Sequence, residues 1–185
     1  MGAGEVRLVI LDRDGVINED SDAFVKSVDE WRPLPDSIEA IAQLSRAGFT
    51  IGVATNQSGL ARGLFDEAAL AAMHGKLERL VAAAGGTVSR IEYCPHGPDD
   101  GCDCRKPATA LYERLARHFD VPLTGVPVIG DSRRDLEAAI AVGARPILVR
   151  TGKGRATETT LDGALTHAEV FDNLSAAASR LIAEI

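Results

Sequence analysis

Apolar residues along this chain gather in short runs, and the segments between the runs have helical periodicity. The runs lie at residues 6–10, 49–54, 88–93, 126–129 and 146–149. Runs of this length that are rich in valine and isoleucine are typical of strands buried on both faces. The pattern therefore predicts five strands, each separated from the next by enough chain for a helix.

In the intervening segments apolar side chains recur every three or four residues, which is the spacing of an amphipathic helix. Asp36 and Asp66 are expected to cap the first two helices, and Gly48 and Gly85 to end them. Three further helices are predicted at residues 107–119, 136–142 and 174–185, and Pro107 is expected to open the first of these.

Strand alternating with helix predicts an α/β fold, with a three-layer, Rossmann-like parallel sheet and helices on both faces. No internal repeat or linker divides the 185 residues, so we expect a single domain over residues 1–185. The chain is too short for a large additional cap domain. Short loops at residues 19–31, 94–104 and 151–154 are expected to shape any site at the sheet edge.

Charge and hydropathy limit the partners that this chain can have. The 27 acidic and 20 basic residues give a net charge of −7, whereas nucleic-acid binding requires clustered lysine and arginine. No apolar stretch approaches the roughly 20 residues of a membrane helix, and no secretion signal is recognisable at the start. We therefore expect a cytoplasmic monomer that binds neither nucleic acid nor membrane, but that can bind a small anion where positive charge is local.

Four aspartates follow predicted strands. Asp12 and Asp14 come after the first strand, Asp131 ends the fourth, and Asp135 lies one helical turn further on. The carboxyl ends of parallel strands meet at one sheet edge, where two such acids can divide nucleophilic attack or metal binding from proton transfer. Four gathered acids repel one another unless a divalent cation lies among them, and oxygen ligands favour magnesium. Taken alone, the first pair is equally compatible with an ordinary acidic turn.

Groups suited to binding phosphate follow the second strand and precede the third helix. Those after the second strand are Thr55, Asn56, Gln57, Ser58 and Arg62. Hydroxyls and amides can donate to phosphate oxygens, and an arginine can clamp them with two hydrogen bonds. Arg105 and Lys106 add two cations before the third helix. A polar connecting loop and two ordinary basic residues are the structural alternatives.

All three cysteines lie in one short loop together with a histidine: Cys94, His96, Cys102 and Cys104. Four soft or borderline ligands form the set of a closed tetrahedral zinc site, which is structural because no position stays open. A disulfide is the main alternative, but three cysteines are an odd number and the chain is expected to be cytoplasmic. Unliganded thiols are the other alternative. The remaining histidines, His74, His118 and His167, have no partner spacing and are expected to be solvated.

Four motifs resemble those of the haloacid dehalogenase superfamily of phosphatases. They are Asp12-Arg-Asp14-Gly-Val-Ile-Asn, Thr55-Asn-Gln-Ser, Lys106-Pro and Gly-Asp131-Ser-x-x-Asp135. With the cysteine loop added, the chain resembles the zinc-containing branch that comprises the heptose bisphosphate and histidinol phosphatases. The resemblance extends from about residue 6 to residue 154.

This resemblance implies a phosphomonoester hydrolase. Asp12 would be the nucleophile that forms an aspartyl-phosphate, and Asp14 would protonate the leaving oxygen and then activate water. Thr55 and Lys106 would hold the phosphoryl oxygens, and Arg105 would help to recognise the substrate. Because Asp14 must be protonated for the first step and ionised for the second, its pKa is expected to rise when substrate is bound.

The resemblance also implies the metal and the substrate. Asp12, the backbone carbonyl of Asp14, and Asp131 would hold magnesium, with Asp135 supporting them. The favoured reaction removes the 7-phosphate of D-glycero-D-manno-heptose 1,7-bisphosphate, for nucleotide-heptose and lipopolysaccharide core synthesis. Histidinol phosphate is the alternative substrate, and a phosphatase of nucleic-acid ends is disfavoured by the acidic charge. A non-catalytic, zinc-stabilised phosphate-binding module is the alternative of another class.

Overall fold

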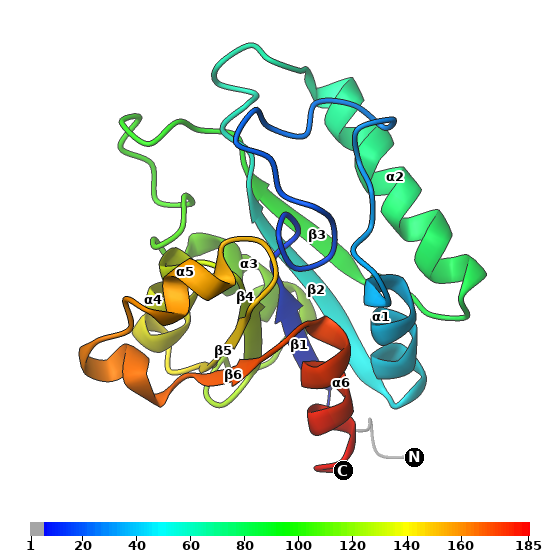
Figure 1. The fold of residues 1–185 in the computed structure, drawn as a ribbon, viewed down its shortest axis with the longest axis vertical. Coiled ribbons are helices and arrows are strands. Elements are labelled where there is room, and N and C mark those ends of the chain that lie inside the picture. Colours follow the sequence, from blue (N-terminus) through cyan, green and yellow to red (C-terminus); the bar gives the residue numbers. More distant parts are fainter. Residues whose placement is uncertain (1–5) are drawn as a thin grey trace.

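The computed structural model describes residues 6–185 and places six strands in one sheet between two layers of helices (Figure 1). The strands are β1 (Arg7–Leu11), β2 (Phe49–Asn56), β3 (Arg90–Cys94), β4 (Pro127–Gly130), β5 (Arg145–Val149) and β6 (Glu169–Phe171). Their order is β3-β2-β1-β4-β5-β6, and every neighbouring pair is parallel. The predicted three-layer α/β fold is confirmed. The predicted domain of residues 1–185 includes residues 1–5, which lie outside the described residues.

Helices cover both faces of the sheet. They are α1 (Ser37–Arg46), α2 (Glu67–Ala83), α3 (Ala110–Phe119), α4 (Arg133–Ala141), the short α5 (Gly154–Glu158) and α6 (Leu174–Ile182), with a 3₁₀ turn at Gly163–His167. In β1, Val9 and Leu11 pack into the core under α1, α2 and α6, whereas Leu8 and Ile10 pack against α3 and α4. This alternation is what a central strand buried on both faces requires. Within residues 6–185 no helix combines the length and apolar composition of a bilayer span.

Three local predictions were wrong. The sequence pattern missed β6, whose three residues are too few to show a period. Pro107 lies in a turn, so α3 begins three residues later, at Ala110. Asp36 has a left-handed backbone (φ 61°) and its side chain caps no N–H group. Asp66, in contrast, accepts a hydrogen bond from the Ala69 amide and caps α2 as predicted.

The strand order reverses between β1 and β4, which lie side by side at the centre of the sheet. Loops that leave the two strands diverge there and open a crevice at their carboxyl ends, where α/β sheets bind ligands. Asp12 is the first residue after β1, and its amide donates to the Ile129 carbonyl of β4 at 2.9 Å. Asp131 is the first residue after β4. The loops after β1, β2 and β3 extend beyond this end of the sheet, in the upper half of Figure 1.

Candidate active site

A cavity of about 240 Å³ opens at this crevice, between the ends of β1, β2 and β4. The predicted site residues that line it are Asp12, Asp14, Thr55, Asn56, Gln57, Ser58, Arg62, Arg105, Lys106, Asp131 and Asp135. The fold thus brings together all the residues predicted to act in catalysis, magnesium binding and substrate binding. The four predicted zinc ligands do not line this cavity but form a separate cluster.

Lys106 is a buried cation at the cavity floor, with 2% of its side chain exposed. Its Nζ lies 3.1 Å from Asp12 Oδ1 and 2.7 Å from Asp135 Oδ1, and donates to the Ala54 carbonyl at 2.7 Å. Burial alone would lower the pKa of Lys106, but the two carboxylates raise it above its ordinary value. Asn56 fixes the backbone of Lys106 through two hydrogen bonds, of 3.2 and 3.0 Å. Lys106 is therefore a permanent positive charge in a fixed position.

The Asp131 carboxylate is enclosed by backbone from two loops. Its Oδ2 accepts a hydrogen bond from the Lys153 amide at 2.8 Å. Gly15 and Gly152, with φ of 82° and 54°, pass so close that a Cβ on either would overlap this carboxylate. Both conformations favour glycine, so these two positions need glycine for the backbone angle and for the space.

Asp12, Asp131 and Asp135 hold carboxylate oxygens within 4.8 Å of one another. Burial would raise the pKa of Asp135, but the charge and hydrogen bond of Lys106 lower it. Burial and the charge of Asp135 raise the pKa of Asp12 well above its ordinary value and that of Asp131 to about 7. A divalent cation would relieve this excess of negative charge, and a set of oxygen donors suits magnesium. The donor set therefore fits the predicted metal.

Asp14 is held by side chains from three directions. Its Oδ1 accepts from Arg13 Nη2 at 2.9 Å and Asn18 Nδ2 at 2.8 Å, and its Oδ2 accepts from Gln57 Nε2 at 2.8 Å. The same Gln57 nitrogen donates to Thr55 Oγ1 at 2.9 Å. Burial alone would raise the pKa of Asp14, but the charge of Arg13 and these hydrogen bonds lower it. The predicted rise of this pKa during the reaction must therefore come from the substrate itself.

Two residues beside Asp14 were missed by the sequence analysis. Arg13 is fully buried, and its Nη1 lies 3.3 Å from Nε2 of His74 on α2. The prediction that His74 is solvated is therefore wrong. The position of Arg13 between two aspartates at the end of a strand could have indicated that its charge pairs with one of them. The sequence held no signal for His74, because its partner is 61 residues away.

Cations gather around the mouth of the cavity. Arg62, Arg105, Arg134 and Lys153 all line it, and the sequence predicted only the first two for substrate binding. Asp20 and Asp22 line the cavity as well, and Lys153 Nζ pairs with Asp20 Oδ2 at 3.3 Å, so the positive charge at the mouth comes from the three arginines. Burial and the neighbouring charges of Arg134 and Arg62 lower the pKa of Arg105. The Arg62 guanidinium lies 5.5 Å from the ring centroid of Phe24, which comes from the loop after β1. The mouth therefore presents several positive charges to an anionic ligand.

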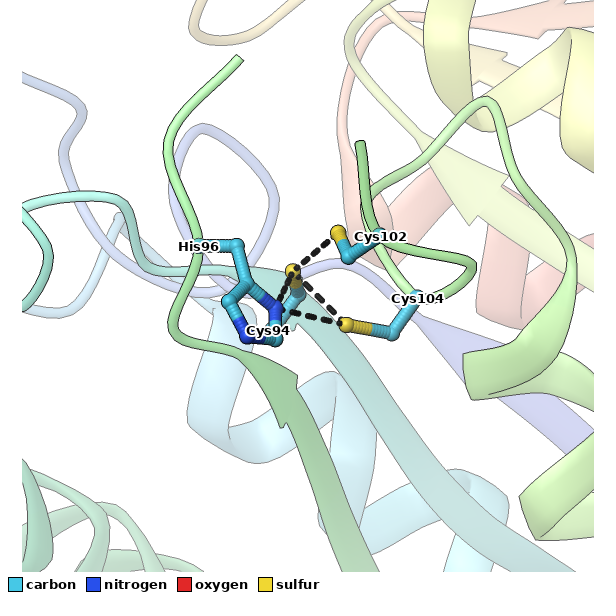
Figure 2. Close-up of side chains that lie close together, drawn as sticks. All are labelled: Cys94, His96, Cys102 and Cys104. Carbon is cyan, nitrogen blue, oxygen red and sulfur yellow. Dashed lines mark hydrogen bonds between the residues drawn. The ribbon is translucent and has the colours of Figure 1, made fainter. Parts of the chain in front are cut away.

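Cys94 ends β3, and its side chain and those of His96, Cys102 and Cys104 in the loop that follows point toward one another (Figure 2). Cys94 Sγ lies 3.6 Å from His96 Nδ1, 3.6 Å from Cys102 Sγ and 2.9 Å from Cys104 Sγ, and the last is 3.2 Å from the same His96 nitrogen. Tetrahedral zinc with bonds of about 2.0–2.3 Å separates its ligand atoms by roughly 3.3–3.8 Å. The two distances of 3.6 Å lie in this range, and the two contacts of Cys104 are shorter. The three cysteines are free thiols, so the structure does not contain the alternative disulfide. The donor set fits zinc.

Comparisons with known proteins find relatives over nearly the whole chain. The family model described as polynucleotide kinase 3 phosphatase matches residues 7–132, and the HAD-hydrolase-like model matches residues 103–177. A D-glycero-β-D-manno-heptose-1,7-bisphosphate 7-phosphatase from Pseudomonas putida is 56% identical over 96% of this chain and 100% of its own. The enzyme of that name from Bordetella bronchiseptica is also 56% identical, over 97% of this chain and 99% of its own.

Two solved structures are also similar to this chain over nearly its whole length. The D,D-heptose 1,7-bisphosphate phosphatase of B. bronchiseptica, crystallised with magnesium and phosphate, superposes with a TM-score of 0.93 at 55% identity. The match covers 97% of this chain and 100% of that chain. The corresponding phosphatase of Burkholderia thailandensis has a TM-score of 0.74 at 43% identity, over 95% and 98% of the two chains. The similarity spans nearly the whole chain.

Proposed function

The chain belongs to the haloacid dehalogenase superfamily of phosphatases, in the branch of the heptose-1,7-bisphosphate 7-phosphatases, and we propose that it removes the 7-phosphate of D-glycero-β-D-manno-heptose 1,7-bisphosphate. The observation that carries this proposal is the convergence of Asp12, Asp14 and Lys106 at the floor of a cavity with arginines around its mouth. The floor suits phosphoryl transfer to a carboxylate. The mouth suits a substrate with a second anionic group.

In the first step, an oxygen of Asp12 attacks the phosphorus of the 7-phosphate, and the bond from phosphorus to the sugar oxygen breaks. Asp14, protonated when substrate is bound, gives its proton to that oxygen, so the sugar leaves as an alcohol. Lys106 and the Thr55 hydroxyl bind the phosphoryl oxygens. Because Lys106 is already fixed by Asp135 and Asn56, it needs no reorganisation as charge develops.

In the second step, water attacks the phosphorus of the aspartyl-phosphate. Asp14, now ionised, takes a proton from this water, and the bond between phosphorus and Asp12 breaks to release phosphate. The lowered pKa of Asp14 keeps its carboxylate ionised in the free site, which is the state that can accept a proton. Gln57 links Asp14 to Thr55, so we assign to it the alignment of the proton-transfer group with the phosphate site.

Two metals complete the proposal. Asp12, the backbone carbonyl of Asp14, and Asp131 would hold magnesium, which when bound neutralises charge on the carboxylates and the phosphate. Cys94, His96, Cys102 and Cys104 would hold a structural zinc. Thiolate ligands of this kind persist in a reducing compartment, which favours the cytoplasm. We further propose that the protein is a monomer.

Charge at the cavity mouth discriminates between the candidate substrates. A heptose bisphosphate carries a second phosphate, which arginines bind well. Histidinol phosphate carries an amine at the corresponding end, which Arg62, Arg105 and Arg134 would repel. The net charge of −7 disfavours a nucleic-acid substrate. The product would feed nucleotide-heptose synthesis for lipopolysaccharide.

The test is magnesium-dependent phosphate release from the β and α anomers of the heptose bisphosphate, histidinol phosphate and a 3′-phosphorylated oligonucleotide. The β anomer is expected to give the highest kcat/KM, by at least about tenfold, a preference of roughly 1.4 kcal/mol. A preference for histidinol phosphate or the oligonucleotide would replace the proposed substrate. No release from any of the four would favour a binding module.

Removal of zinc is expected to disorder the loop after β3 rather than to unfold the chain, because the sheet and both cores are built largely without it. Cys102→Ser should lose the bound zinc, measured by metal analysis, and should raise KM for the bisphosphate several-fold through Arg105. Arg105 Nη1 donates to the His96 carbonyl at 3.4 Å, so the loop positions this guanidinium. Ser179→Ala, exposed on α6 and outside both metal sites, is the control for zinc content and KM. Retention of one zinc by Cys102→Ser would contradict the assigned ligands.

The metal-free protein is expected to lose stability as pH rises from about 4 to 7. Folding raises the pKa of Asp131 from 3.8 to about 7, so the folded state binds the proton more tightly than the unfolded state. That contribution is complete below pH 4 and is lost as the pH rises through 7. Magnesium replaces the proton, so the increase in Tm caused by magnesium should grow over the same interval. A shift in Tm independent of pH would argue against binding at Asp131.

A further inference from the structure

We propose that His74 is a positioning residue for proton transfer by Asp14, and that it acts through Arg13. This inference rests on the proposed function, because it concerns the proton that Asp14 gives to the leaving sugar. It concerns two residues that the reaction steps above do not use.

Arg13 is the closest cation to the Asp14 carboxylate. Its Nε and Nη2 donate to Asp14 Oδ1 at 3.1 and 2.9 Å, and Nη2 also lies 3.2 Å from Oδ2. The guanidinium is planar, so one edge of it is fixed against Asp14. Its side chain is fully buried, so water cannot satisfy the N–H groups of the other edge. Those groups need an acceptor from the protein.

His74 supplies this acceptor from α2. Its Nε2 lies 3.3 Å from Arg13 Nη1, and a guanidinium can only donate, so Nε2 must be the unprotonated nitrogen of a neutral ring. Burial and the charge of Arg13 lower the pKa of His74 to about 4, which keeps the ring neutral at physiological pH. The guanidinium is therefore fixed at two points, by Asp14 on one edge and by His74 on the other.

Fixing Arg13 matters for the step in which Asp14 acts as an acid. Proton transfer requires the carboxyl group to stay within hydrogen-bond reach of the leaving oxygen. The contact with His74 keeps the Arg13 guanidinium in plane beside this carboxyl group. Without an acceptor at residue 74, a buried N–H group loses its partner and Arg13 turns to find another.

Comparing two substrates with different leaving groups distinguishes this role from a purely structural one, which would change the rates of both substrates equally. A sugar alkoxide needs a proton to leave, whereas p-nitrophenolate leaves from p-nitrophenyl phosphate as a stable anion. His74→Leu, of similar size but without an acceptor, is expected to lower kcat/KM for the heptose bisphosphate about tenfold, a fraction of the full effect of a general acid. Its kcat/KM for p-nitrophenyl phosphate, which like the first reports only steps up to departure of the leaving group, should stay within about twofold. His74→Gln, which retains an acceptor, should recover most of the loss.

His118→Leu is the matched control, because His118 is exposed on α3 and its ring meets the neighbouring Phe119 ring edge to face. Should His74→Leu fail to fold in thermal unfolding, Arg13→Lys tests the same link, since an ammonium cannot span Asp14 and residue 74. It should show the same dependence on leaving group. Equal losses on both substrates, or no loss on the bisphosphate, would overturn the inference. A wild-type chain without phosphatase activity would instead overturn the proposed function, and the inference with it.

Discussion

Replacing Asp12 with asparagine is expected to lower phosphate release from the heptose bisphosphate by at least about 10,000-fold, because an amide cannot take the place of the carboxylate nucleophile. Asp12 Oδ1 already accepts from the Arg13 amide at 2.7 Å and pairs with Lys106 at 3.1 Å. Both contacts use the same oxygen, and Oδ2 can attack. Asparagine preserves the shape of the side chain and can keep the hydrogen bond to the amide, so the fold should be unchanged.

The measurement is single-turnover phosphate release at saturating magnesium, together with acid-quench detection of phosphorylated protein. Wild-type protein should accumulate label from substrate phosphorylated at the 7-position, and Asp12→Asn should accumulate none. Asp29→Asn is the matched control, since Asp29 is exposed in the loop after β1 and does not line the cavity. Activity of Asp12→Asn within tenfold of wild type would mean that water attacks the substrate directly.

Replacing Lys106 with methionine is expected to reduce both activity and stability. Methionine fills a similar volume but leaves the Asp12 and Asp135 carboxylates without the cation between them. Removing one partner of a buried ion pair typically lowers the free energy of unfolding by about 3–5 kcal/mol, because the remaining charge is left uncompensated. Loss of a fixed charge at the phosphoryl oxygens should also lower kcat by about 100- to 1,000-fold.

Urea unfolding with and without magnesium separates these two effects. Magnesium should restore part of the stability of Lys106→Met, because it neutralises Asp12, but it should not restore activity. Lys26→Met is the control, since Lys26 forms a partly exposed pair with Glu30 at 3.1 Å and should change stability by less than about 1 kcal/mol. If Lys106→Met lowered the free energy of unfolding no more than Lys26→Met does, the role of Lys106 as the central cation would be contradicted.

The sequence alone determined the fold class and the identity of most residues at the cavity. Runs of apolar residues repeat with a period that depends only on local backbone geometry, so strands and helices could be placed without knowing their neighbours. Asp12 and Asp131 were found because they directly follow two such runs, and the ends of parallel strands meet at one edge. The cysteines and His96 were found because all four residues lie within 11 positions of one another.

The tertiary structure decided which of these side chains meet. Three contacts join segments that are distant in sequence. Lys106 pairs with Asp135, Asn56 binds the backbone of Lys106, and His74 contacts Arg13. The period of apolar residues predicts which face of a helix or strand is buried. It does not predict which side chain of another element packs against that face. A polar residue in a buried position must find a partner, and only the packing of α2, β2 and the loop after β3 against β1 determined which one.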